Sequence, residues 1–249
     1  MDKTIKVKIG IHLISQVLDL ARFLLNFIVF AFYGIVFIFL AYRVIKRNRT
    51  RISFIITGFY LSCGTGVIVD LVYIIITPLI EDLILLFLYF ITVFLLSMSL
   101  CFLNLFVMML YKSERIFTTQ IQLLYLFFFS ILILTLFLIP NAVAINESTG
   151  WRPKWSLVFT VLFLMICTFG AIIPTYYYSI KLYQKIENKD LRKRWLCFII
   201  GISGYFFLCY GTSYFCYFGH VNLIIWAIIA MPSLINLYLI YYGIGRQME

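Results

Sequence analysis

The sequence of 249 residues predicts an all-α membrane protein, a single seven-transmembrane-helix bundle with its N-terminus outside and its C-terminus cytoplasmic. Hydrophobic residues make up 64% of the chain and charged residues only 12%, whereas soluble domains usually carry about 25% charged residues. Too few polar side chains remain to cover a water-facing surface. A helix needs about 20 apolar residues to cross the hydrocarbon core. The stretches that qualify are about 21–43, 52–78, 83–111, 117–140, 155–181, 195–218 and 221–244.

The uncharged segment near the C-terminus is long enough to require two spans rather than one. No residue from Trp195 to Gly245 carries a formal charge, and one helix over that segment would run about 75 Å, more than twice the membrane thickness. The chain must therefore turn once within it. The segment YFGHVN at 217–222 holds the Gly, His and Asn residues that suit a turn.

Alternate loops are basic, and this pattern sets the predicted orientation. The loop after the first span has five Lys or Arg residues and no acid, and the fifth loop, 181–195, has six against Glu187 and Asp190. The second loop, PLIEDL at 78–83, is acidic. Because Lys and Arg accumulate on the cytoplasmic side, we expect the first, third and fifth loops there. These residues either only fix the topology or also contact anionic lipid or a cytoplasmic partner. The candidates for such contact are Lys46, Arg47, Arg49, Arg51, Lys189, Arg192, Lys193 and Arg194.

Asp70 is a carboxylate inside the apolar run GTGVIVDLVYIII at 64–76. A charge at bilayer depth is costly, so such residues usually have a function. Asp70 would lie about 27 Å along the second span, in its outer half. A polar stripe on the first span would bring Arg22 and Asn26 to a similar depth on one helix face. Three interpretations remain open: Asp70 holds two helices together, anchors a ligand in an outward-facing pocket, or belongs to a proton or ion relay.

Asn104 in the third span is the residue expected to continue a polar path inward from Asp70. Buried Asn side chains also serve as hydrogen-bonding contacts between helices, which is the alternative. Pro174 can kink its helix. Gly201 and Gly204 in the sixth span favour close helix packing.

The sequence argues against an enzyme, a cofactor and a metal site. His12 and His220 are its only histidines, whereas a zinc site needs about three protein ligands. Neither histidine lies deep enough to activate an intramembrane serine. The six cysteines lie in or beside apolar segments without a CxxC pair, as expected for buried thiols. The net charge of +10 is concentrated in short loops, so no nucleic-acid partner is expected.

Two segments carry a resemblance to a known class of proteins. They are LRKRWLCFIIGISGYFF at 191–207, a basic helical loop that runs into a Gly-containing span, and LYLIYYGIGR at 237–246. In these features the chain resembles the prokaryotic, including archaeal, seven-transmembrane sensor modules that are often fused to histidine kinases. No lysine in 224–242 could hold retinal as in microbial rhodopsins, and PSLINLY at 232–238 differs from the Asn-Pro-x-x-Tyr motif of rhodopsin-like receptors.

We therefore expect a receptor- or sensor-like, multi-pass protein of the cell membrane. A small or lipidic ligand would enter an outer-half pocket lined by the first, second, third and seventh spans. The ligand-binding candidates are Asp70, Arg22, Asn26 and Asn104. Since the resemblance implies an output domain that this sequence does not contain, signalling would require a separate cytoplasmic partner. The alternatives are a small-solute or ion transporter or channel, or a non-catalytic membrane subunit of a larger complex.

Overall fold

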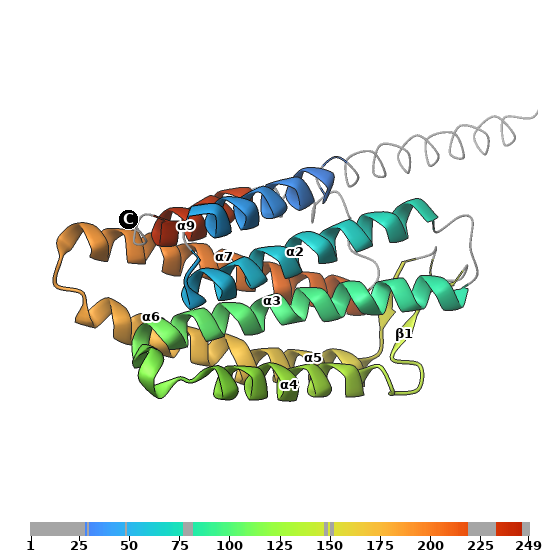
Figure 1. The fold of residues 1–249 in the computed structure, drawn as a ribbon. Coiled ribbons are helices and arrows are strands. Elements are labelled where there is room, and N and C mark those ends of the chain that lie inside the picture. The colour runs from blue at the N-terminus through green and yellow to red at the C-terminus, as the bar shows by residue number, and fades with distance from the viewer. Residues whose placement is uncertain are drawn as a thin grey trace, which may run out of the picture.

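The structure, a computed structural model, describes residues 28, 30–47, 49–76, 82–146, 149, 152–218 and 233–245. Helices dominate it and lie side by side in one elongated bundle (Figure 1). The first described helix covers residues 30–47. The other elements are α2 (Arg51–Ile76), α3 (Asp82–Ile116), α4 (Thr119–Leu136), β1 (Val143–Ala144), β2 (Lys154–Trp155), α5 (Leu157–Cys167), the π-helix η2 (Thr168–Ile172), α6 (Ile173–Lys185), α7 (Lys189–Phe218) and α9 (Ser233–Gly245).

Five of the described helices are long and apolar enough to cross a membrane. They are Arg51–Ile76, Leu83–Lys112, Thr119–Leu136, Leu157–Lys185 and Lys189–Phe218. The all-α class and the multi-pass membrane character expected from the sequence are therefore supported. The predicted first and seventh spans, 21–43 and 221–244, lie partly outside the described residues.

Element boundaries differ from the sequence-based spans mainly at the charged ends. The helix of the predicted sixth span begins at Lys189 rather than near Trp195, and the first helix continues to residue 47. Basic residues at the end of the first helix interact favourably with its negative dipole end, which explains the extension there. At the start of α7, Asp190 complements the positive dipole end, and the Asn188 side chain accepts hydrogen bonds from the N–H groups of Asp190 and Leu191.

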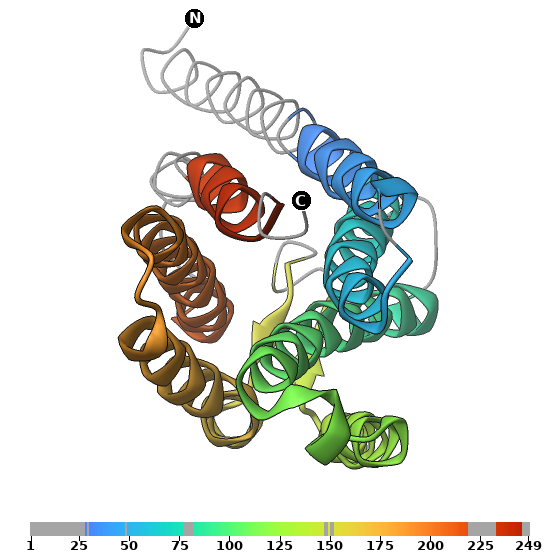
Figure 2. The same cartoon turned by 60° about the vertical axis from the view of Figure 1, so that its left-hand side comes forward.

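The helix α3 lies at the centre of the packing. It contacts α2 along much of its length and also packs against α4, η2 and α6. A second extensive contact joins α7 to α9 (Figure 2). The helices α2, α3 and α4, which follow one another in the chain, are thus neighbours in space, as short antiparallel connections require.

Glycines bring α7 and α9 close together. A Cβ added at Gly201 would lie 2.7 Å from the backbone oxygen of Asn236, and one at Gly243 would lie 2.6 Å from the Phe198 Cβ. At Gly204 an added Cβ would overlap the Asn236 side chain. The close packing expected at Gly201 and Gly204 is therefore present, and the partner helix is α9.

A short antiparallel hairpin closes one end of the bundle. Val143 of β1 pairs with Trp155 of β2, and both side chains are buried. Asn141, with φ of 54°, adopts the left-handed conformation at the turn that leads into β1. The Ser156 N–H donates to the Ala142 carbonyl at 2.9 Å and continues the pairing. We call this end, shown beside the β1 label in Figure 1, the hairpin end.

Arg152 and Lys154 lie at the hairpin end, whereas the opposite end of the bundle carries most of the described basic residues. There the first helix connects to α2, α3 to α4 and α6 to α7, and there α9 ends (Figure 1). We call it the basic end and define it by residues 42–47, 49–51, 111–112, 177–194 and 241. The predicted charge asymmetry between alternate loops thus corresponds to two distinct ends of the bundle.

Candidate functional site

A polar cluster lies near the hairpin end, where α2, α3, α7 and β2 meet. The indole N–H of Trp155 donates to the Tyr89 hydroxyl at 2.7 Å. The same hydroxyl lies 3.6 Å from the Cys216 sulfur. The rings of Tyr73 and Tyr89 lie 5.8 Å apart. The Asp70 carboxylate lies within electrostatic range of Tyr89 and Cys216. We call Asp70, Tyr73, Tyr89, Trp155 and Cys216 the Asp70 cluster.

The local sequence explains why these side chains meet. Asp70 and Tyr73 are three residues apart and therefore share a face of α2. Tyr89 lies early in α3, next to the end of α2, and Cys216 lies in the last turn of α7. The hairpin then carries Trp155 into the bundle from the hairpin end. Tyr73, Tyr89 and Trp155 are buried, whereas Asp70 and Cys216 are half-buried.

Within the described part of the chain, Asp70 makes no hydrogen bond or ion pair. Its predicted neighbours Arg22 and Asn26 lie outside the described residues. The structure therefore places Asp70 within electrostatic range of a phenolic hydroxyl and a thiol, those of Tyr89 and Cys216. A carboxylate in such a place can accept hydrogen bonds, or pair with a positive charge, from a molecule that enters the cluster.

Asn104 belongs to a different site. It lies 15 residues beyond Tyr89 on α3, which is about 22 Å along the helix. Its side chain is fully buried and its Nδ2 donates to the Tyr125 hydroxyl at 2.6 Å and to the Gly170 carbonyl at 3.5 Å. The Asn104 Oδ1 has no hydrogen-bond partner among the described residues. The structure thus separates Asn104 from the Asp70 cluster.

The π-helix η2 explains why polar groups collect around Asn104. Because Pro174 has no N–H, the carbonyl of Gly170, four residues earlier, loses its α-helical donor, and the proline ring also crowds that carbonyl. The helix widens there, and the Ile173 N–H donates to the Thr168 carbonyl five residues back. The Tyr125 hydroxyl donates to the freed Gly170 carbonyl. Segments of π-helix often mark functional sites.

Two further polar contacts link α7 to its neighbours. The Tyr205 hydroxyl forms hydrogen bonds with the Ser99 hydroxyl at 2.5 Å and with the Cys63 thiol at 3.0 Å. The hydroxyls of Thr168 and Tyr210 are 2.5 Å apart and hydrogen-bonded. Polar side chains on α3 therefore recur at three depths: at Tyr89, Ser99 and Asn104.

Basic side chains at the basic end lie over tyrosine rings. The Lys185 ammonium lies 4.2 Å from the centroid of Tyr111, and the Arg192 guanidinium 4.5 Å from that of Tyr183. Such pairs combine an aromatic interfacial position with a cation–π attraction. The remaining pairs are Arg43 with Tyr241, Lys46 with Tyr42, Lys112 with Tyr178 and Lys181 with Tyr177.

The predicted contact residues divide between two places at this end. Lys46, Arg47, Arg49 and Arg51 lie around the junction of the first helix with α2. Lys189, Arg192, Lys193 and Arg194 form the first turns of α7. Arg194 is half-buried and the other members of this set are exposed.

The described residues contain no group of three or more His, Cys, Asp or Glu side chains that could hold a metal ion. All six cysteines are free thiols, and Cys63, Cys101 and Cys167 are buried. The side chains of the Asp70 cluster offer hydrogen bonding, charge pairing, aromatic contact and a free thiol.

Sequence reasoning missed Tyr89, Trp155, Tyr125 and Gly170. A signal existed for Gly170, since it stands four residues before Pro174. The sequence predicts Trp155 as the first residue of the span 155–181. In the structure it lies in β2, and the hairpin places its indole against Tyr89. The long separation between these two residues in the chain left no local pattern to find.

No protein-family model, no curated protein and no solved structure matches this chain.

Proposed function

We propose that the protein is a seven-helix, receptor- or sensor-like membrane protein that binds a small or lipidic ligand at the Asp70 cluster and catalyses no reaction. One observation carries the proposal. A half-buried carboxylate without a hydrogen-bonding or ionic partner in the described part of the chain lies within electrostatic range of Tyr89 and Cys216, near the place where three helices and the hairpin meet. Ionisable residues at membrane depth are usually functional.

The orientation that we propose puts the hairpin end outside and the basic end in the cytoplasm. The cation–tyrosine pairs at the basic end support it, because Lys and Arg favour the cytoplasmic face and tyrosine favours the interface. The Asp70 cluster then lies in the outer half of the bundle. The seven-helix count rests on the sequence together with the described helices 30–47 and α9.

The composition of the cluster suggests what the ligand carries. A carboxylate accepts hydrogen bonds and attracts positive charge, and the faces of Tyr73, Tyr89 and Trp155 suit hydrocarbon or an organic cation. A ligand with an amine or another donor group and an apolar body fits this chemistry. The Asp70 carboxylate would be its polar anchor.

Transmission to the basic end would use α3. Tyr89, Ser99 and Asn104 occupy this one helix, and Asn104 reaches the π-helix η2 through Tyr125 and Gly170. A displacement of α3 at the hairpin end would therefore change its contacts with η2, where α5 and α6 join. The loop between α6 and α7 follows α6 directly. The basic residues in the first turns of α7 would then contact a cytoplasmic partner.

Thiol labelling from each side of sealed vesicles tests the site and the orientation together. In a variant that keeps only Cys216, the membrane-impermeant cationic reagent 2-(trimethylammonium)ethyl methanethiosulfonate should modify Cys216 from the outside. Its rate relative to that of the anionic 2-sulfonatoethyl methanethiosulfonate should exceed the same ratio for a free thiol in solution several-fold, because Asp70 attracts the cation. The substitution Asp70→Asn should lower this ratio to that of the free thiol.

Two exposed positions serve as side-specific controls. Arg152→Cys in the hairpin should react only from outside and Glu187→Cys, between α6 and α7, only from the cytoplasm. If Cys216 is unreactive from both sides, the cluster is dry and the proposed pocket is absent. If Asp70→Asn also leaves thermal stability and the reagent preference unchanged, Asp70 has no anchoring role.

A transporter is the second candidate, and the polar side chains at three depths of α3 favour it. Its distinguishing requirement is water access from both sides of the membrane. A single cysteine introduced at Ser99, the middle depth, separates the two functions. Labelling of that cysteine from both sides would support transport, whereas labelling of Cys216 from outside alone supports the receptor.

A further inference from the structure

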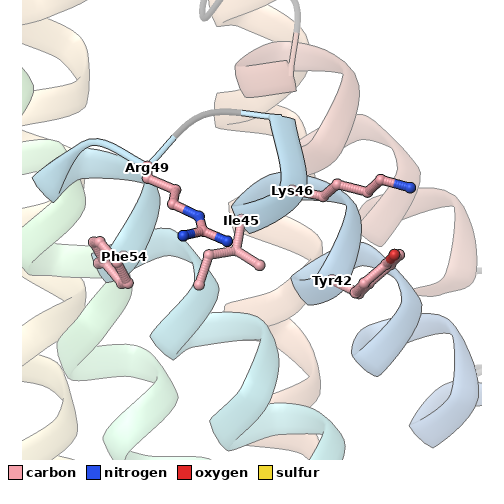
Figure 3. A pocket seen from close by; sticks show the side chains of 5 residues that line it. All are labelled: Tyr42, Ile45, Lys46, Arg49 and Phe54. Carbon is pink, nitrogen blue, oxygen red and sulfur yellow. The ribbon is translucent and has the colours of Figure 1, made fainter.

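A pocket opens at the basic end between the last turn of the first helix and the first turn of α2. Its volume is about 400 Å³ and its lining residues are Tyr42, Ile45, Lys46, Arg49 and Phe54 (Figure 3). Two cations, two aromatic rings and one aliphatic side chain thus surround one space. The Asp70 cluster has no part in this pocket.

The polar part of the pocket is positively charged. Figure 3 shows the Arg49 side chain reaching between the two helices beside Ile45 and Phe54, while Lys46 extends from the outer side of the first helix. The Lys46 ammonium lies 5.5 Å from the centroid of the Tyr42 ring. Residues 43–51 contain no Asp or Glu. An anion is therefore the complementary occupant.

The start of α2 adds to this attraction. The Thr50 hydroxyl accepts a hydrogen bond from the Ser53 N–H at 3.3 Å, and the Thr50 carbonyl accepts one from the Phe54 N–H at 3.1 Å. Thr50 is thus the N-cap of α2, directly after Arg49. The positive dipole end of a helix lies beside the pocket, which favours negative charge there.

Apolar side chains continue from the pocket toward the middle of the bundle. On the first helix Ile35 is 66% exposed and Phe39 55% exposed, and both lie on the same helix face as Tyr42. On α2, Phe54 and Leu61 are seven residues apart and therefore share a face, with exposures of 54% and 44%. A charged pocket thus joins a hydrocarbon-facing surface on two adjacent helices.

We propose that this pocket binds an anionic phospholipid of the cytoplasmic leaflet. Lys46 and Arg49 hold the phosphate of the head group, and the acyl chains lie along the exposed faces of the first helix and α2. Basic pockets between transmembrane helices on the cytoplasmic side are suited to such head groups. The adjoining apolar surface favours a lipid over a free phosphate, because only the lipid also covers that surface.

Lipid competition measured on the purified full-length chain tests the proposal. Palmitoyl-oleoyl phosphatidylglycerol and the matching phosphatidylcholine are added to the detergent-solubilised protein, and bound lipid is counted by native mass spectrometry. Wild type should retain phosphatidylglycerol at least about fivefold better than phosphatidylcholine. The double substitution Lys46→Gln and Arg49→Gln should reduce retention of phosphatidylglycerol to that of phosphatidylcholine.

A matched control separates the pocket from general surface charge. Arg152→Gln with Lys154→Gln removes the same charge from exposed positions at the hairpin end and should leave the lipid preference unchanged. Equal losses in both double variants would overturn the proposal. So would a preference that survives in the pocket variant.

Soluble head groups distinguish the lipid from a free anion. Glycerol phosphate or inorganic phosphate at millimolar concentration should displace little phosphatidylglycerol, because neither covers the apolar surface. Full displacement would instead assign the pocket to a free phosphate. Both substituted residues are exposed, so the melting temperature without added lipid should remain that of wild type.

Discussion

Tyr125 donates its hydroxyl proton to the carbonyl oxygen of Gly170, the residue four positions before Pro174. This side chain supplies the hydrogen bond that the proline removes from the helix backbone. The contact ties α4 to the π-helix η2 in the span Leu157–Lys185. A carbonyl that has lost its backbone donor in one helix thus accepts a hydrogen bond from a side chain of another helix.

Replacing Tyr125 by Phe should lower the free energy of unfolding by about 1 kcal/mol, because a buried carbonyl loses its nearer donor. Denaturant titration in detergent measures the loss. Tyr238→Phe is a suitable control, since it makes the same chemical change on a side chain that is 63% exposed. Equal effects of the two substitutions would show that the Tyr125 hydroxyl contributes nothing specific.

Pro174→Ala tests the proposed cause of the π-helix. The N–H that this substitution restores can donate to the Gly170 carbonyl, so the Tyr125 hydroxyl becomes less necessary. Tyr125→Phe should therefore cost less stability in the Pro174→Ala background than in wild type. Additivity of the two changes within about 0.5 kcal/mol would contradict this account.

Trp155→Phe should loosen the hairpin. The substitution removes the 2.7 Å hydrogen bond to Tyr89 while keeping an aromatic ring in place. Amide hydrogen exchange should become faster at residues 142–146 and 154–156, with little change at the basic end.

Trp195→Phe provides the control at the opposite end. The Trp195 indole donates to the Ser179 carbonyl at 2.8 Å and is likewise buried. Its replacement should affect exchange near the junction of α6 and α7 and leave the hairpin unchanged. Faster exchange in the hairpin of this variant would mean that the effect is general loosening rather than a local loss.

Gly201→Ala should destabilise the contact between α7 and α9. The new methyl group would meet two backbone atoms of α9, the Asn236 oxygen at 2.7 Å and the Ile240 nitrogen at 2.9 Å, so the helices must move apart. We expect a loss of about 1–3 kcal/mol in unfolding free energy from overpacking. Thermal unfolding in detergent measures it.

Gly66→Ala isolates the packing contribution. Both substitutions gain the same helix propensity, but an added Cβ at Gly66 first meets the end of the Leu96 side chain at 3.2 Å rather than a backbone atom of another helix. The Gly66 variant should therefore lose less stability than the Gly201 variant. A similar loss at both positions would rule out the backbone clash as the cause.

The sequence was sufficient for the class of fold because the membrane constrains every span in the same way. Length and charge alone located the five described spans within about six residues. The largest difference falls where basic residues extend a helix, at Lys189, and α4 ends at Leu136, a few residues before the predicted position 140. The close packing at Gly201 was also predictable, since only a small residue permits it. Both features are visible in short segments of the sequence, whereas the partner of Gly201, the helix α9, is distant in the chain.

The site was less predictable because its contacts join distant segments. Asp70 is conspicuous in the sequence, but Trp155 reaches Tyr89 only through a hairpin whose sequence is that of a nearly neutral loop. Asn104 and Asp70 both stood out as polar residues, and about 22 Å of α3 separates Asn104 from the Asp70 cluster. Arg22 and Asn26 lie outside the described residues, so their pairing with Asp70 stays a prediction.

The π-helix also changes how the faces of its span must be assigned. One additional residue is accommodated between Thr168 and Ile172, so a helical wheel drawn at a uniform 100° per residue is out of phase by about 100° beyond that point. Positions in α6 that such a wheel assigns to lipid are rotated toward a neighbouring helix. Thr175 and Ser179, four residues apart and both fully buried, mark the face of α6 that packs inward. A mutational scan of this span should therefore use two wheels, one for each side of η2.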